Sequence, residues 1–215
     1  MMRLLAGLLL ALVFSIPAAA KAPQSGVFDY FVLALSWSPT YCASHGDDQQ
    51  QCAPGRKFAF VVHGLWPQFS QGWPQFCDTP ESWVDPAEID AMMAIMPSKR
   101  LIIHQWKKHG SCSGVSQRDY FQATRLLFDR IRIPARYLSP TADVVTTPQQ
   151  LVTDFVKTNS ALTASMISVQ CGTTKGRARL SELRICLDKR GGFAACGANE
   201  IRQCRASTLV LPEVR

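Results

Sequence analysis

Eight cysteines constrain the fold of this 215-residue chain more than any other feature. All of them lie after residue 40, and their even number in an exported chain predicts disulfides. No two have the Cys-x-x-Cys spacing, which argues against a zinc ribbon or a redox pair. Eight cysteines allow 105 pairings, so the spacing alone leaves the connectivity open. Each bond would stabilise the fold by about 2–4 kcal/mol.

The first twenty residues have the composition of a signal peptide. Arg3 supplies a positive start, residues 4–16 are apolar, and residues 18–20 offer three alanines for cleavage near Lys21. The apolar run is short for a membrane span, and an uncleaved anchor is the alternative. We therefore expect an exported protein, periplasmic or secreted, without a membrane segment after cleavage. The absence of an Asn-x-Ser/Thr sequon favours the bacterial periplasm.

Residues 21–215 have the length of a single domain with one sizeable core, which we expect to be monomeric. Charge is unevenly distributed within them. Residues 23–90 hold two Lys/Arg and eight Asp/Glu, a net charge of −6, whereas residues 91–215 hold nineteen and eight, a net charge of +11. The basic half suggests an anionic partner, either nucleic acid or a lipid surface, with ordinary solvated charge as the alternative.

Hydrophobic patterns and proline or glycine breaks predict helices mixed with strands. Strands are predicted for residues 28–37, 57–63, 166–171, 179–187 and 207–211, and helices for residues 86–96, 100–109, 116–133 and 148–159. Because the two types do not alternate regularly, we expect an α+β fold with a central antiparallel sheet flanked by helices. The second strand is expected to end at His63.

Two short blocks contain three of the four histidines. The first is His63-Gly64-Leu65-Trp66-Pro67, and the second is His104-Gln105-Trp106-Lys107-Lys108-His109-Gly110-Ser111-Cys112. The distant first histidine can face the second block across a cleft. The fourth, His45, lies in a polar loop and is expected at the surface.

A histidine pair of this kind suits the cleavage of a phosphodiester. One imidazole removes a proton from the attacking hydroxyl and the other protonates the departing oxygen, while Lys108 stabilises charge on the phosphoryl oxygens. With RNA the attacker is the neighbouring 2′-OH, so no metal or other cofactor is required and DNA should resist. Trp66, Trp73 and Phe69 could stack a base.

Two other interpretations of these blocks remain open. In the first, the histidines are structural residues whose rings are hydrogen-bonded to the backbone, as is usual for a lone histidine. Trp66 and Trp106 could likewise belong to the core, which we expect for Trp106. A zinc site is the other, but His104 and His109 would lie about 140° apart around a regular helix, a poor chelating geometry. A third ligand, such as His63, would be needed.

The two blocks resemble the active-site blocks of the ribonuclease T2 family, which comprises acid, metal-independent endoribonucleases. Residues 28–37 also resemble the family's opening strand, and the likeness spans essentially the whole mature chain. The resemblance implies that His63 is the general acid and His109 the general base in a first step that gives a 2′,3′-cyclic phosphate. The cyclic product is then opened to a 3′-phosphate with the roles reversed.

The resemblance also implies further roles. His104 would bind the phosphate, Lys108 would stabilise the transition state, and Trp66 would help to bind the base of a single-stranded RNA substrate. The family's disulfide pattern implies the bonds Cys42–Cys52, Cys77–Cys112, Cys171–Cys204 and Cys186–Cys196.

The chain departs from the family at Gln105, where the second block normally has glutamate. Glutamine can donate a hydrogen bond to a phosphoryl oxygen, but it carries no charge with which to tune a neighbouring histidine. We expect an active enzyme with an altered rate or pH optimum. The rival interpretations are a catalytically weakened RNA-binding member of the same fold, a zinc-dependent hydrolase, and a disulfide-rich structural protein.

Overall fold

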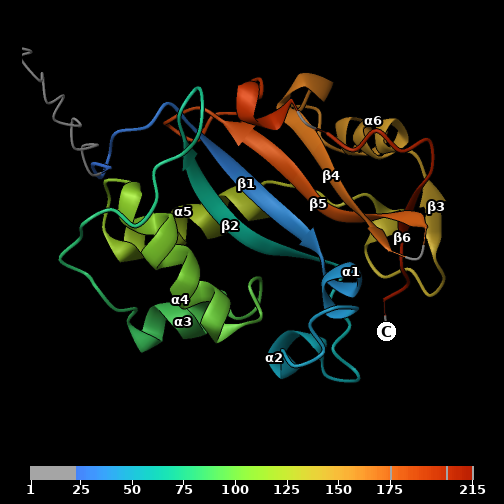
Figure 1. Cartoon of the computed structure of the whole chain (residues 1–215), viewed down its shortest axis with the longest axis horizontal. Helices are drawn as coiled ribbons and strands as arrows, with labels where there is room; N and C mark the ends of the chain where they lie inside the picture. The colour runs from blue at the N-terminus through green and yellow to red at the C-terminus, as the bar shows by residue number, and fades with distance from the viewer. Residues whose placement is uncertain (1–22, 175, 202, 215) are drawn as a thin grey trace, which may run out of the picture.

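The computed structural model of the chain describes residues 23–174, 176–201 and 203–214. The predicted signal peptide, residues 1–20, lies outside them. A twisted six-stranded sheet crosses the molecule with helices packed around it (Figure 1). Among the helices of these ranges, none has the length and apolarity needed to cross a membrane.

The sheet has the strand order β2-β1-β5-β6-β3, and β4 pairs with β5 outside this path. Its strands are β1 (Tyr30–Trp37), β2 (Phe60–Gln68), β3 (Val144–Thr146), β4 (Ile167–Thr174), β5 (Arg177–Leu187) and β6 (Leu209–Leu211). The helices are α1 (Ser38–Cys42), α2 (Gln49–Cys52), α3 (Pro86–Met92), α4 (Lys99–Lys108), α5 (Gln117–Asp129) and α6 (Pro148–Thr158).

The predicted α+β fold is confirmed, but the sheet is mixed, not purely antiparallel. Strands β5 and β6 pair in parallel through Arg179 and Val210, whereas the other strand pairs are antiparallel. The connection between β5 and β6 spans residues 188–208, which is long enough for the chain to return and run in the same direction.

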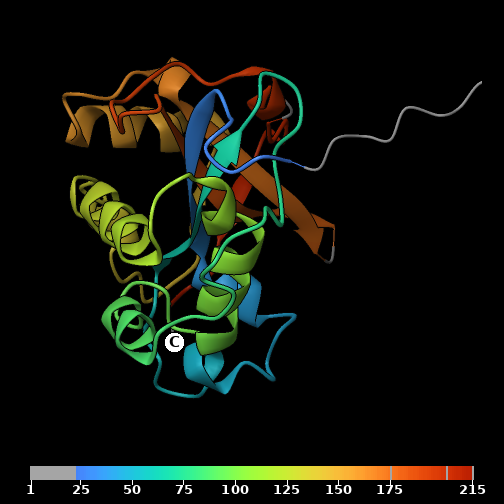
Figure 2. The ribbon, with the colours of Figure 1, turned by 90° about the vertical axis from the view of Figure 1, so that its left-hand side faces the viewer.

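One face of the sheet carries the main core. Alternate residues of β1, Leu33, Leu35 and Trp37, are fully buried there, and α5 and α6 lie on this side of the sheet (Figure 2). Phe155 of α6 packs edge-on against Phe60 of β2, with ring centroids 5.6 Å apart. The opposite face of the sheet is therefore available for polar and charged side chains.

The predicted end of the second strand at His63 is wrong, because β2 continues to Gln68. Residues 65–68 find antiparallel partners in Tyr30 to Leu33 of β1. Pro67 is compatible with the strand because β2 lies at the edge of the sheet, which is where strands tolerate proline. The short elements α1, α2 and β3 were not predicted, since a few residues give little periodicity.

Four disulfides cross-link the fold, and none of the described cysteines is free. They join Cys42 to Cys52, Cys77 to Cys112, Cys171 to Cys204 and Cys186 to Cys196. The second bond ties the segment after β2 to η1 (Gly110–Cys112), the short 3-10 turn that follows α4. It therefore fixes the end of the helix that carries the second histidine block.

Gly110 lies so close to its neighbours that the position has no room for a larger side chain. A Cβ atom at this position would overlap Trp106 and lie 3.0 Å from the ring of buried Tyr120. We expect Gly110→Ala to lower the free energy of unfolding by about 1–3 kcal/mol, the usual range for overpacking. Denaturant unfolding would measure this, with Gly46→Ala as the control because nothing lies within 4 Å of a Cβ there. Equal stability of the two variants would contradict the packing argument.

Candidate active site

A pocket of about 250 Å³ opens where β2, α4 and β5 meet. Its walls come from segments that are far apart in the sequence. The lining residues are His63, Trp66, Gln68, Trp73, His104, Gln105, Lys108, His109, Arg184, Asn199 and Glu200. Both histidine blocks therefore contribute to one cavity.

A β-bulge in β2 presents His63 to this pocket. Gly64 pairs with Ala34 and Val62 pairs with Leu35, which leaves His63 as the extra residue of the pair. A bulge of this kind re-aims a side chain, and bulges are common beside active sites. In a regular strand His63 and Trp66, three positions apart, would point to opposite faces. The bulge lets both of them reach the same pocket.

Helix α4 is joined to β2 by a hydrogen bond between side chains. The indole Nε1–H of Trp66 donates to Oε1 of Gln105 at 2.8 Å, and Gln105 is only 2% exposed. The bond passes closely over Gly64, where a Cβ atom would overlap both partners. Glycine at this position lets the helix approach the strand.

The Trp66 ring lies close to both catalytic candidates. Its centroid is 5.1 Å from the His63 ring and 5.4 Å from the His109 ring. The guanidinium of Arg184 lies over the same indole, 5.1 Å from its centroid. The indole thus sets the spacing of both imidazoles and is itself held by a cation.

His109 is a buried histidine at the end of α4. Its residue is 6% exposed, and its Nδ1 has no hydrogen-bond partner among the described residues. Burial, followed by the nearby charges of Lys108, His63 and His104, lowers the pKa of His109 to about 3. The ring is therefore neutral at ordinary and mildly acidic pH, which is the state a general base needs.

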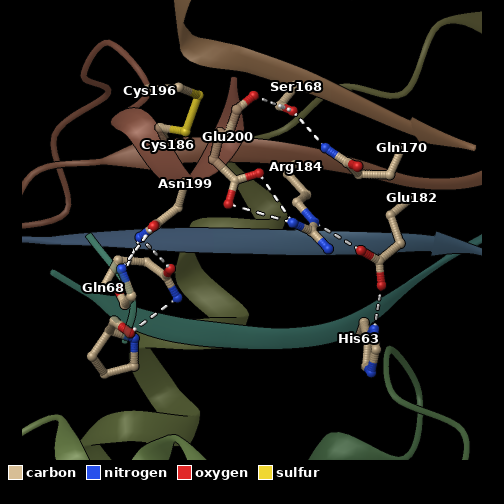
Figure 3. A network of polar contacts seen from close by, with 12 residues as sticks. His63, Gln68, Ser168, Gln170, Glu182, Arg184, Cys186, Cys196, Asn199 and Glu200 are labelled. Atoms are coloured by element: carbon tan, nitrogen blue, oxygen red, sulfur yellow. Dashed lines mark hydrogen bonds and ion pairs between the residues drawn. A yellow bond between two sulfur atoms is a disulfide. The ribbon is translucent and has the colours of Figure 1, made fainter. Parts of the chain in front are cut away.

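His63 is held from the opposite side by a carboxylate. Its Nδ1 lies 2.5 Å from Oε1 of Glu182 in β5, and Glu182 is 9% exposed. The other oxygen of this carboxylate accepts from Nε of Arg184 at 2.8 Å. Figure 3 shows His63, Glu182 and Arg184 as a continuous chain of polar contacts.

The chain of contacts continues into η4 (Ala198–Glu200), a short 3-10 turn. Nη1 of Arg184 lies 3.1 Å from Oε2 of Glu200, a buried residue. The neighbouring Asn199 amide donates to Gln68 and to the carbonyls of Phe69 and Gly72. These bonds fix the loop that follows β2 to the far wall of the pocket (Figure 3).

His104 and Lys108 lie one helical turn apart on α4 at the rim, where Lys108 adds positive charge. Burial, together with the charges of Lys108 and His63, lowers the pKa of His104. His104 is exposed and Lys108 is half-buried. Both can reach an anion in the pocket without the cost of a fully buried charge.

Seven of the eight predicted site residues line the pocket, and Phe69 does not. Trp106 is 1% exposed, as expected for the core, and His45 is exposed. The sequence interpretation missed Glu182, Arg184 and Glu200. Glu182 and Arg184 stand among apolar residues of the predicted strand 179–187, which was a signal, because charges that become buried are nearly always paired. In the described residues no group of three or more His, Cys, Asp or Glu is placed to hold a metal ion.

The buried neutral state of His109 predicts how stability depends on pH. Its folded pKa of about 3 lies below the ordinary value of 6.5, so between these values the unfolded chain binds a proton that the folded chain does not. Stability from this source is fully present above pH 6.5 and falls as the pH drops toward 3, with a slope of at most about 1.4 kcal/mol per pH unit. We expect His109→Gln to flatten this slope in denaturant melts, whereas the surface variant His45→Gln keeps it. An unchanged slope in His109→Gln would contradict the buried neutral ring.

Known proteins resemble this chain in sequence and in fold. The sequence profile of the Ribonuclease T2 family matches residues 28–196. The chain is 43% identical over 132 residues to a ribonuclease of Aeromonas hydrophila and 37% identical over 134 residues to a probable ribonuclease of Haemophilus influenzae. These alignments cover 61% and 56% of this chain but only 59% and 48% of the two relatives.

The solved structure of RNase NT in complex with 5′-AMP superposes with a TM-score of 0.60 at 27% identity. The superposition covers 79% of this chain and 91% of that one. The matched region includes both histidine blocks, the strand β2 and the helix α4 on which they lie, and Glu182. The chain belongs to the ribonuclease T2 family.

Proposed function

We propose that this chain is a metal-independent endoribonuclease that cleaves single-stranded RNA by attack of the 2′-OH on the adjacent phosphate. The observation that carries the proposal is that His63 and His109 line one pocket, each with its ring close to that of Trp66. Two imidazoles on either side of one scissile linkage can move protons to and from it without a metal.

In the first step neutral His109 accepts the proton of the 2′-OH, and the 2′-oxygen bonds to phosphorus. His63 gives its proton to the 5′-oxygen as the bond from phosphorus to that oxygen breaks. The products are a 2′,3′-cyclic phosphate and a free 5′-hydroxyl. In the second step His63 takes a proton from water, the water oxygen bonds to phosphorus, and His109 protonates the departing 2′-oxygen to leave a 3′-phosphate.

The surroundings of the two rings support this assignment of roles. His109 is buried and neutral, so it can accept a proton even in mild acid. His63 is hydrogen-bonded to the Glu182 carboxylate, which compensates positive charge on the ring that donates the proton. One environment disfavours the charged ring and the other accommodates it, which is how pairs of titratable groups divide acid and base work.

Charge on the phosphoryl oxygens is met by groups of α4. Lys108 supplies positive charge and His104 offers a ring N–H, and the amide nitrogen of Gln105 remains available because its oxygen is occupied by Trp66. Donors placed where charge develops contribute the largest single term in many enzymes. Trp66 and Trp73, which is 51% exposed, offer flat faces for an unpaired base.

A relative of similar fold also holds a nucleotide, since RNase NT was solved in complex with 5′-AMP. The catalytically weakened alternative is not favoured. Gln105 makes a well-formed hydrogen bond to Trp66, and the remaining groups of both blocks line the pocket. We also propose that residues 21–215 act as one monomeric, exported domain, a setting that suits four disulfides.

The proposal predicts the chemistry of the products. Purified protein incubated with RNA in excess chelator should give 2′,3′-cyclic phosphate ends first and 3′-phosphate ends later, and should leave DNA intact. His63→Ala and His109→Ala should each lower kcat by roughly 10²–10⁴-fold, the usual contribution of one acid or base. Loss of activity in chelator, or 5′-phosphate products, would contradict the mechanism.

The uncharged side chain of Gln105 allows a second test, in the dependence of kcat/KM on pH. A glutamate there can still accept the Trp66 N–H, but it places a negative charge beside buried His109. Such a charge favours the protonated ring, so we expect the acid limb of kcat/KM for Gln105→Glu to move to higher pH. Profiles measured from pH 3 to 8 on one RNA substrate would reveal the shift. Coincident profiles would mean that residue 105 does not tune the histidines.

A further inference from the structure

We propose that Glu182 is a positioning residue of this active site, which locks the His63 ring so that Nε2 faces the substrate. The inference rests on the proposed function and adds a residue from β5 that lies outside both histidine blocks. Glu182 does not touch the substrate. It acts through the imidazole, and Arg184 and Glu200 hold it in place.

The contact between Glu182 and His63 is the shortest polar contact of the site. Oε1 of Glu182 lies 2.5 Å from Nδ1 of His63, and Glu182 is almost completely covered. In the part of the chain that the structure describes, no other carboxylate bonds to a pocket histidine. A carboxylate accepts hydrogen bonds and cannot donate them, so Nδ1 must carry a hydrogen. The remaining ring nitrogen, Nε2, is then the one that exchanges protons with the substrate.

Both oxygens of Glu182 are occupied, which prevents the carboxylate from rotating. The second oxygen accepts from Nε of Arg184 at 2.8 Å, and Arg184 is also paired with Glu200 at 3.1 Å. The backbone carbonyl of Glu200 accepts from Ser168 of β4 at 3.1 Å. Figure 3 shows this path from His63 to β4 through three buried or half-buried charges.

Glu182 is ionised in this setting. Burial alone would raise its pKa, but the hydrogen bond and charge of His63 and the guanidinium of Arg184 bring the pKa below its ordinary value. The charge is balanced within the network, because the single cation of Arg184 lies between two carboxylates. One negative charge therefore remains to compensate a protonated His63.

This assignment also shows where the negative charge that the second histidine block lacks is supplied. With Gln105 in α4, negative charge beside the histidines comes from the strand side of the pocket. The groups that face His63 are Glu182 and Arg184 from β5, Glu200 from η4, and His104, Lys108 and His109 from the α4 segment. Of these, only the two glutamates are acidic, and only Glu182 contacts the ring.

The variant Glu182→Gln tests the idea with little disturbance, since Arg184 keeps Glu200 as its partner. Arg184 needs an acceptor, so the glutamine oxygen should turn to Arg184 and its amide nitrogen to His63. An NH₂ group facing Nδ1 favours the opposite tautomer, with the hydrogen on Nε2. We expect kcat to fall roughly 10- to 100-fold while KM changes less than about threefold. The matched control is Glu88→Gln, which removes a glutamate paired with Arg118 on the surface.

Two further measurements separate positioning from a general structural role. Nitrogen NMR of the His63 ring, at a pH where the ring is neutral, should find the hydrogen on Nδ1 in the native protein and on Nε2 in Glu182→Gln. In the double variant His63→Ala/Glu182→Gln, activity should equal that of His63→Ala alone, because Glu182 has no route to the substrate without His63. Identical tautomers in both proteins, or additive losses in the double variant, would overturn the proposal. The NMR result does not depend on catalysis, so it holds or fails separately from the proposed ribonuclease activity.

Discussion

The contact of the Trp66 indole with its four neighbours holds this site together. The indole bonds to Gln105 of α4 at 2.8 Å, and it touches the rings of His63 and His109 and the guanidinium of Arg184. Removal of the indole would leave the buried Gln105 oxygen without its partner, and an orphaned buried polar group costs about 1–3 kcal/mol. It would also remove the ring that packs against both imidazoles. The spacing of the catalytic groups therefore depends on packing between one strand and one helix.

The two sides of the pocket have opposite electrostatic effects on the histidines. On the helix side, burial and a cluster of positive charges keep His109 neutral. On the strand side, the buried carboxylate of Glu182 accommodates positive charge on His63, and Arg184 and Glu200 extend the network into the fold. A neutral base and a compensated acid in one pocket can divide their tasks without a metal.

Much of this arrangement follows from the sequence, and the rest follows from pairing that local patterns do not encode. The long elements β1, α4, α5 and α6 were predicted within a few residues, because their apolar periodicity and their proline or glycine ends are strong local signals. The histidine blocks identified most of the pocket. The bulge at His63 depends on the register against β1, and the Glu182 contact joins residues 119 positions apart, so neither could be read locally. The disulfide pairs came from family resemblance and not from spacing.

The proposed catalysis requires one phosphate to lie between the imidazoles of His63 and His109. The most direct measurement is a crystal structure of the protein with a dinucleotide that lacks the attacking 2′-OH and so cannot be cleaved. We predict that Nε2 of His63 lies within hydrogen-bond distance of the 5′-oxygen, with His109 beside the 2′-position and Lys108 on a phosphoryl oxygen. A phosphate bound outside this pocket, or one that contacts only a single histidine, would contradict it.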